Sequence, residues 1–186
     1  MSPWGQGGRY RGQERRWLAA PGSLSARLAA AGSAFSVQVL NQGRQELYRD
    51  EAHALGLTGS ASAYVREVIL RVDGNAVVFA RSVTRQPHSL GPWRSLRGLG
   101  TRPLADVLFR RAGIARGPLQ FRQITPVGVM RRHVGRTWQQ ATGAAPLIRA
   151  MPARRSVFSR GGAPLLVMEV FAALQEPWCW PTGRRS

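Results

Sequence analysis

Three charged residues, Arg66, Arg81 and Glu169, fall on strand faces that are otherwise apolar. Successive side chains of a β-strand point to opposite faces, and two positions before and after each charge the residue is aliphatic or aromatic. The strands are expected over Tyr64–Val72, Val77–Thr84 and Leu165–Phe171. Burying an unpaired charge costs on the order of several kcal/mol, so each of the three needs a partner.

Two interpretations of these charges are compatible with the residues alone. In the first, Arg66 and Glu169 form a structural ion pair, or the side chains reach solvent at a sheet edge. In the second, the two arginines line a closed cavity between the sheet and its helices and bind an anionic ligand, while Glu169 meets a hydroxyl group. Two cations against one acid favour a ligand with carboxylates, which the planar guanidinium group binds through paired hydrogen bonds.

Turn and capping residues indicate the elements that would hold these strands. Ser23 is suited to cap a helix that runs through Ala31, with Gly32 as its left-handed stop. Asp73-Gly74 predicts a hairpin, and Asn41–Gly43 predicts a turn after an alternating strand. The other expected elements are a helix from Pro103 to Gly113, a strand near Leu119 and a final hairpin around Gly161-Gly162. Residues 126–152 are left without an element.

The length and the pattern both favour one domain. A chain of 186 residues is long enough for a domain with a core and short for two. Hairpins with a few helices predict an α+β fold on an antiparallel or mixed sheet. Residues 1–13, rich in glycine and arginine, are expected to form a flexible basic tail, residues 14–178 the domain, and residues 179–186 a C-terminal tail.

The composition excludes several classes of chemistry. The chain has 27 basic residues against 9 acidic ones, and every basic residue is arginine. Without lysine, neither a complete Walker A phosphate loop nor a lysine Schiff base can form. Cys179 stands alone, which excludes intramolecular disulfides and cysteine-rich metal sites. The three histidines are far apart in sequence, and we expect no metal and no cofactor.

The sequence also lacks a recognisable targeting or membrane segment. The basic N-terminus has no apolar stretch of the kind that a secretory signal requires. The longest apolar stretch, Ala163–Leu174, contains Glu169 and is shorter than the roughly 20 residues of a membrane helix. A cytoplasmic protein with no membrane span is therefore expected.

The segments that carry the three charges also make the chain similar to the chorismate lyase (chorismate pyruvate-lyase) family. The resemblance covers most of Ser23 to Phe171, with its motifs in the same order and at plausible spacing. The similar segments are Tyr64–Leu70, Asp73-Gly74, Arg81–Val83, Gly100–Leu104, Leu108-Phe109, Arg154–Ser156 and Pro164–Phe171. No single motif is highly specific, and the ordered set is what identifies the family.

The resemblance implies a small single-domain α+β enzyme with an antiparallel sheet and helices that cover a buried ligand cavity. Such enzymes use no cofactor and convert chorismate to 4-hydroxybenzoate and pyruvate, the first committed step of ubiquinone synthesis. The expected partners are therefore the substrate chorismate and the product 4-hydroxybenzoate, and the chain is expected to act as a monomer.

The resemblance also assigns residues. The family's carboxylate-binding arginine corresponds to Arg66, and its acid near the ring hydroxyl corresponds to Glu169. The backbone amide of Leu104, expected at the start of a helix, would share the ring carboxylate with Arg66. Leu24 stands where the family usually has a methionine that contributes a backbone contact. Arg81 matches a second family arginine, expected to bind the enolpyruvyl carboxylate or to stabilise the leaving enolate.

Two other functions remain open. The same fold could serve as a non-catalytic metabolite-binding module, because effector domains of some bacterial transcription regulators resemble it. Alternatively, the excess of arginine could bind nucleic acid through phosphates. The sequence contains no helix-turn-helix, zinc finger or RNP pattern, so no specific nucleic-acid partner is expected.

Overall fold

An antiparallel sheet forms the centre of the protein. The structure, a computed structural model, describes residues 4–6, 10–57, 63–110, 112–146 and 150–172. Within them, seven strands form one sheet in the order β1-β2-β3-β7-β6-β4, and β5 pairs with β6 beside β4. Every strand pair is antiparallel. The strands are β1 Phe35–Gln45, β2 Ala63–Val72, β3 Asn75–Arg85, β4 Ile114–Arg116, β5 Gln120–Ile124, β6 Met151–Arg160 and β7 Ala163–Phe171.

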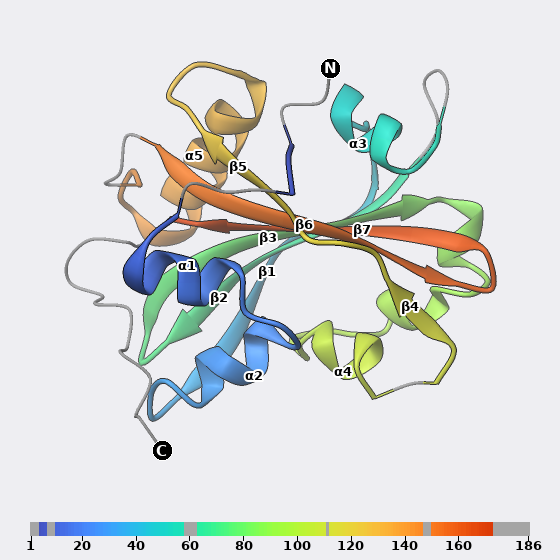
Figure 1. The fold of residues 1–186 in the computed structure, drawn as a ribbon, viewed down its shortest axis with the longest axis horizontal. Helices are drawn as coiled ribbons and strands as arrows, with labels where there is room; N and C mark the ends of the chain where they lie inside the picture. The colour runs from blue at the N-terminus through green and yellow to red at the C-terminus, as the bar shows by residue number, and fades with distance from the viewer. Residues whose placement is uncertain (1–3, 7–9, 58–62, 111, 147–149, 173–186) are drawn as a thin grey trace.

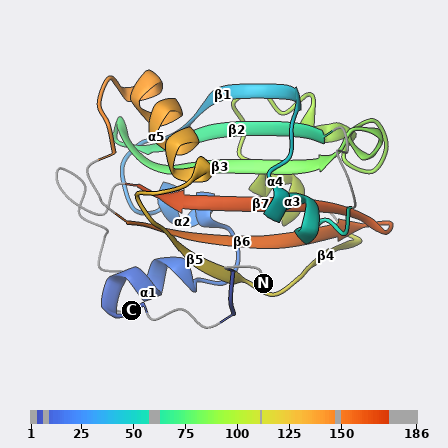
Figure 2. The same cartoon turned by 90° about the horizontal axis from the view of Figure 1, so that it is seen from above.

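Helices cover both faces of the sheet. In Figure 1 the sheet is seen nearly edge-on, with α3 and α5 on one side and α1, α2 and α4 on the other. Figure 2 shows the strands side by side in the order given by their pairing, with α5 crossing them. The helices are α1 Gly12–Leu18, α2 Leu24–Ala29, α3 Arg49–Ala54, α4 Ala105–Leu108 and α5 Val129–Thr142, with 3-10 turns η1 Pro87–Ser89 and η2 Arg94–Leu96. The predicted α+β class with an antiparallel sheet is confirmed.

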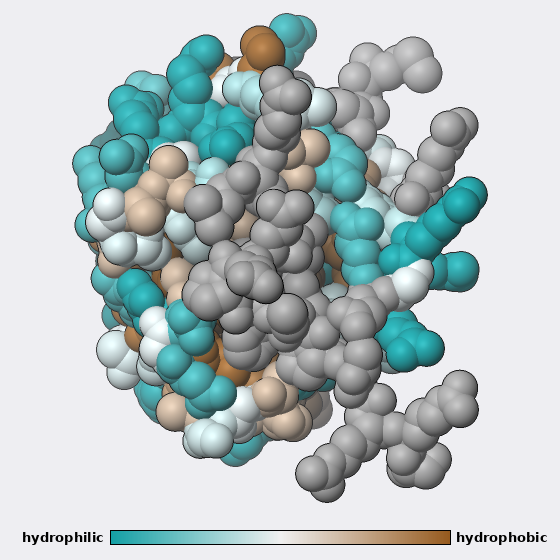
Figure 3. Space-filling view, turned by 90° about the vertical axis from the view of Figure 1, so that its left-hand side faces the viewer, coloured by the Kyte–Doolittle hydropathy of each residue, from teal (hydrophilic) through white to brown (hydrophobic). Residues whose placement is uncertain are grey.

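The core is divided by the sheet. On the face of α1 and α2, Trp17, Leu28 and Phe171 belong to one buried apolar cluster. On the face of α5, Phe79 and Trp138 belong to another. On the parts of the face coloured in Figure 3, hydrophilic residues surround smaller apolar areas. None of the helices in the described residues combines the length and apolar character needed to cross a membrane.

Two local predictions are confirmed. The Ser23 side chain accepts a hydrogen bond of 3.0 Å from the amide of Ala26 and so caps α2. Asp73 and Gly74 both have positive φ, 49° and 80°, as a tight hairpin between β2 and β3 requires. This hairpin fixes how the two central strands enter the sheet.

Other local predictions are wrong. Asn41–Gly43 forms no turn, because β1 continues through it, paired with β2, after a bulge beyond Val39. The helix expected from Pro103 to Gly113 is limited to the four residues of α4. Gly32 has no positive φ. It is instead packed so closely that a Cβ there would lie 2.4 Å from Cγ1 of Val72.

Part of the expected N-terminal tail is packed on the domain. The Trp4 side chain is 6% exposed, and its indole nitrogen donates a hydrogen bond of 2.8 Å to Asp50. Gly5 forms a β-bridge with Phe121, and Tyr10 is buried against the same phenylalanine. Trp4, Gly5 and Tyr10 are thus packed on the domain. The expected C-terminal tail and Cys179 lie outside the described residues.

Candidate active site

A pocket lies between the sheet and the segments around α2 and α4. Its empty volume, counted together with its open mouth, is about 610 Å³. Its floor consists of inward-facing residues of β1, β2, β3, β7 and β6, and its cover includes residues of α2, α4 and the loops beside them. The polar side chains that line it are Ser25, Arg66, Ser82, Arg116, Arg154, Ser156 and Glu169.

Arg66 lies in this pocket and is held by backbone carbonyls rather than by an acid. Its side chain is 2% exposed, and Nη2 donates hydrogen bonds to the carbonyls of Gly100 at 2.8 Å and Arg102 at 3.3 Å. Its buried Nε has no hydrogen-bond partner among the described residues. Burial lowers the pKa of Arg66, but a guanidinium group remains protonated in proteins. The pocket therefore contains a fixed positive charge with an unused donor.

Glu169 lies in the same pocket, but its partner is Arg154 and not Arg66. The two residues face each other across β6 and β7, and Nε of Arg154 donates to the Glu169 carboxylate. The interpretation of Arg66 and Glu169 as a structural ion pair is therefore wrong. Because Arg154 neutralises the acid, the charge on Arg66 is not compensated by it.

The strand register determines how far Arg66 is from Glu169. Glu169 pairs with Ala80 on β3, and Ala80 pairs with Val68 on β2. Val68 follows Arg66 by two residues on the same strand. With about 4.8 Å between neighbouring strands and about 3.4 Å per residue, the Cα atoms of Arg66 and Glu169 are about 12 Å apart. Once both side chains extend inward, this separation suits a six-membered ring with a polar group at each end.

Leu24 and Leu104 both line the pocket from the cover. Leu24 is the first residue of α2, and Leu104 is the N-cap of α4. The four residues of α4 are too few to produce a substantial helix dipole. An anion at Leu104 would therefore be bound by a hydrogen bond from the backbone amide alone. The helix dipole that was expected from a longer helix would contribute little.

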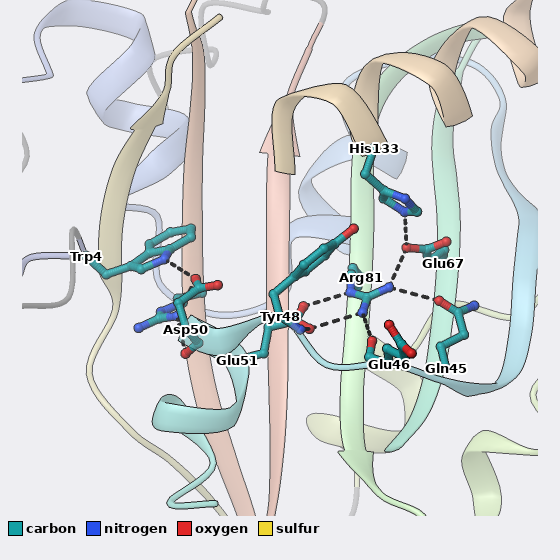
Figure 4. Close-up of polar contacts among 10 residues, drawn as sticks. Trp4, Gln45, Glu46, Tyr48, Asp50, Glu51, Glu67, Arg81 and His133 are labelled. Carbon is teal, nitrogen blue, oxygen red and sulfur yellow. Dashed lines mark hydrogen bonds and ion pairs between the residues drawn. The ribbon is translucent and has the colours of Figure 1, made fainter. Parts of the chain in front are cut away.

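Arg81 does not lie in the pocket, and the expectation that it shares a cavity with Arg66 is wrong. It lies on the opposite face of the sheet, near α3 and α5, and is 1% exposed (Figure 4). Nε and Nη2 bind the Glu51 carboxylate at 2.7 and 3.0 Å, and Nη1 binds Glu67 at 2.7 Å. Burial alone would lower the pKa of Arg81, but the two carboxylates outweigh it and raise that pKa. Arg81 is thus fully engaged in a structural ion cluster.

A β-bulge explains why Arg81 points away from the pocket. Next to the hairpin turn, Arg71 pairs with Ala76. The following pair joins Leu70 to Val78, so β3 carries one extra residue. A shift of one residue reverses the face of every later side chain. Without the bulge, Arg81 would lie opposite Arg66 and face the pocket.

His133 completes the cluster around Arg81. It lies on α5 and its Nε2 is 2.6 Å from the same Glu67 oxygen that binds Arg81 (Figure 4). His133 is thus a helix residue, and its partner Glu67 is buried. Within the described ranges, no group of three or more His, Cys, Asp or Glu side chains is arranged to hold a metal ion.

Two arginines of the pocket, Arg154 and Arg116, were not among the candidates from the sequence. The final hairpin was expected only around Gly161-Gly162, with residues 126–152 left without an element, but β6 starts at Met151 and so includes Arg154. On that longer strand, Arg154 alternates with Ser156 and Phe158, which also line the pocket. The same alternation rule would have found Arg154 had the start of the strand been recognised. Arg116 lies on the short strand β4 and had no comparable signal.

Comparison with known sequences identifies close relatives. A family model described as chorismate lyase matches residues 12–178. A protein of Albidiferax ferrireducens named "Probable chorismate pyruvate-lyase" is 64% identical over 184 residues, which cover 99% of this chain and 93% of the relative. A protein of Cupriavidus metallidurans with the same name is 42% identical over 158 residues, covering 85% of this chain and 72% of the relative.

Comparison with solved structures finds the same fold in more distant proteins. The effector domain of PhnF from Mycobacterium smegmatis aligns with a TM-score of 0.54 at 17% identity and covers 82% of this chain and 89% of that domain. The C-terminal domain of a histidine utilization repressor from Pseudomonas syringae pv. tomato aligns with a TM-score of 0.55 at 10% identity, covering 82% and 99%. At these identities the likeness concerns the fold alone.

Proposed function

The chain belongs to the chorismate lyase family, and from that premise we propose that it converts chorismate to 4-hydroxybenzoate and pyruvate. The observation that carries the proposal is the pocket itself, which Arg66 and Glu169 both line, with their Cα atoms about 12 Å apart according to the strand register. Chorismate has a ring carboxylate at one end and a 4-hydroxyl group at the other. Arg66 would bind the carboxylate and Glu169 the hydroxyl.

This reaction depends mainly on how the protein orients the substrate. The C3–O bond breaks and its electron pair leaves with the enolpyruvyl oxygen, while C4 loses its proton and the ring becomes aromatic. The leaving enolate takes up a proton to become pyruvate, so atoms and charges balance without water, metal or cofactor. The thermodynamic drive is the aromatisation of the substrate. The protein must mainly hold the ring and stabilise developing charge.

The pocket residues that the sequence predicted each have a role in this scheme. Arg66 and the Leu104 amide would bind the ring carboxylate, and the backbone at Leu24 would contribute from the cover. Glu169, held by Arg154, would accept a hydrogen bond from the 4-hydroxyl and help to orient C4 for proton loss. Arg81 has no part in the scheme, since its guanidinium lies across the sheet.

A cofactor-free assay tests this proposal. Purified protein is mixed with chorismate in the presence of a chelator, 4-hydroxybenzoate is separated by chromatography, and pyruvate is measured with a coupled dehydrogenase. We expect both products in equal amounts. Release of 3-hydroxybenzoate would assign a different lyase reaction, and the absence of both products would contradict the proposal.

The fold of regulator effector domains supports one alternative, a module that binds a metabolite without converting it. Calorimetry with chorismate distinguishes the two functions, because this alternative requires binding with no pyruvate formed. We propose further that the enzyme acts as a monomer in the cytoplasm and supplies ubiquinone synthesis. Light scattering after size exclusion would test the first point. Restored ubiquinone in a bacterium lacking its own chorismate lyase would test the pathway.

A further inference from the structure

The arginines of the pocket fall into two kinds. Arg154 is paired with Glu169 and is bound by three backbone carbonyls. Arg66 and Arg116 have no carboxylate partner among the contacts of the described residues, and each has a buried Nε without a hydrogen-bond partner there. Leaving a buried donor unpaired destabilises the folded protein, so two such donors in one pocket indicate two places where a ligand acceptor could bind.

Arg116 is held in position for such a ligand. Its Nη1 donates to the carbonyl of Gly22 at 3.3 Å. The centre of its guanidinium lies 5.3 Å from the ring centroid of Phe158 and 5.8 Å from that of Phe109. Aromatic faces attract a guanidinium without occupying its hydrogen-bond donors. The group is therefore oriented but remains able to bind an anion.

Arg116 lies beside β6, the strand that also carries Arg154, because it pairs with Phe158, and both Phe158 and Arg154 line the pocket. Burial lowers its pKa, and the nearby charge of Arg154 lowers it further, while Glu169 raises it. Arg66 lies about two strands away from Glu169, at the other end of the ring position derived above. The pocket thus has two cations without a carboxylate partner, Arg66 from β2 and Arg116 from β4, on opposite sides of the strands β3, β7 and β6.

Chorismate carries two carboxylates, one on the ring and one on the enolpyruvyl side chain, and the side chain is attached next to the carbon that bears the hydroxyl. We propose that Arg116 binds the enolpyruvyl carboxylate and so selects the dianionic substrate. This inference rests on the proposed function and assigns the second carboxylate, for which Arg81 is no longer available. The ring carboxylate remains with Arg66.

This assignment separates the substrate from the aromatic product. The enolpyruvyl carboxylate leaves with pyruvate, so 4-hydroxybenzoate retains only the group bound by Arg66. Arg116 therefore contributes to the binding of chorismate and not to the binding of 4-hydroxybenzoate. Arg66 contributes to both.

The test compares these two ligands in Arg116→Met and Arg116→Gln. We expect kcat/KM for chorismate to fall about 10- to 100-fold, the value of a lost charge-assisted hydrogen bond, while the inhibition constant of 4-hydroxybenzoate stays within about twofold. The control is Arg110→Met, which removes an arginine that is 80% exposed on the same segment and should alter neither quantity. Unchanged kcat/KM in the folded Arg116 variants, or equal weakening of both ligands, would overturn the proposal.

A second measurement does not depend on turnover. Calorimetry compares 4-hydroxybenzoate with 3-(carboxymethoxy)-4-hydroxybenzoate, an unreactive aromatic dianion with the second carboxylate beside the hydroxyl. Arg116→Met should weaken only the dianion, and Arg116→Lys should retain part of its affinity. If the wild-type protein bound these ligands as expected but released no pyruvate from chorismate, the lyase function would fail while the role of Arg116 stood. If the dianion bound equally well to wild type and Arg116→Met, Arg116 would have no such role.

Discussion

Arg154 and Glu169 are opposite each other on β6 and β7, and the same guanidinium that binds the Glu169 carboxylate also binds the backbone at the C-terminal end of α1. Nη1 of Arg154 donates to the carbonyls of Leu18 and Ala20, both at 3.1 Å. Since Arg154 is 1% exposed, its position is fixed on several sides. The orientation of Glu169 is therefore determined by a residue that was not among the candidates from the sequence.

Replacing Arg154 should impair catalysis more than substrate binding. In Arg154→Met, Glu169 loses the group that orients it, and we expect kcat to fall about 10- to 100-fold, with a smaller change in KM, in steady-state assays of folded protein. The control is Arg155→Met, because Arg155 lies on the same strand but binds Gln120 and Asp50 away from the pocket. Equal losses of kcat in the two variants would show that the effect is structural.

Arg66 should be required for both turnover and product binding. Arg66→Ala should lower kcat/KM for chorismate by about 10²- to 10³-fold. Arg66→Lys should also be severely impaired, because a lysine ammonium group cannot form the paired, planar hydrogen bonds of a guanidinium group. The affinity for 4-hydroxybenzoate should fall in parallel, unlike in the Arg116 variants. Arg44→Ala, which removes an exposed arginine of β1, is the control. Full activity in either Arg66 variant would contradict its role.

Arg81 should stabilise the protein without taking part in catalysis. Removing one partner of a buried ion cluster costs about 3–5 kcal/mol, so Arg81→Met should lower the free energy of unfolding in urea by about this amount. Below its melting temperature, the folded variant should keep its kcat/KM within about twofold. Arg81→Lys retains the charge and serves as the milder variant. Low activity in a folded Arg81 variant would show that Arg81 takes part in catalysis.

Much of the fold and the central pair of the site could be predicted from strand alternation. That rule correctly put Arg66 and Glu169 on faces turned to the same pocket, because both strands are regular around these residues. The hairpin at Asp73-Gly74 was equally predictable, since few other residues adopt positive φ readily.

The bulge in β3 marks the limit of this approach. An ideal two-residue hairpin would pair Arg66 with Arg81, whereas the extra residue pairs Arg66 with Ser82. Nothing in the local sequence predicts this extra residue. The bulge depends on tertiary contacts that are distant in sequence, among them the ion pairs of Arg81 with Glu51 and Glu67. Helix α5 was missed for a related reason, since its arginines and glycine obscure the buried stripe of Met130, Val134 and Trp138.

Acid should weaken the contribution of Glu67 to stability. Burial alone would raise its pKa, but the hydrogen bond with His133 and the ion pair with Arg81 outweigh burial and hold the pKa below 4.5. Glu51 faces the same guanidinium from α3, and Tyr48 packs over it.

A group with a lowered pKa in the folded protein stabilises that protein above the pKa of the unfolded chain, and this contribution is lost as the pH falls through the folded-state pKa. The free energy of unfolding should therefore exceed that of Glu67→Gln at about pH 6, and the difference should shrink below about pH 4.5. A difference that grows towards acid pH would contradict this assignment.

Gly32 should not tolerate a side chain, although its backbone conformation is ordinary. A Cβ would lie 2.4 Å from Cγ1 of Val72 and 2.5 Å from Oδ2 of Asp73. Asp73 cannot easily move, because its Oδ1 accepts hydrogen bonds from the amides of Ser33 and Ala34 at 2.8 and 2.7 Å. Gly32→Ala should therefore lower the free energy of unfolding by about 1–3 kcal/mol in urea titrations. Gly98→Ala is the matched control, since a Cβ there meets nothing within 4 Å, and a Gly32→Ala protein as stable as this control would show that the hairpin yields to the added methyl group.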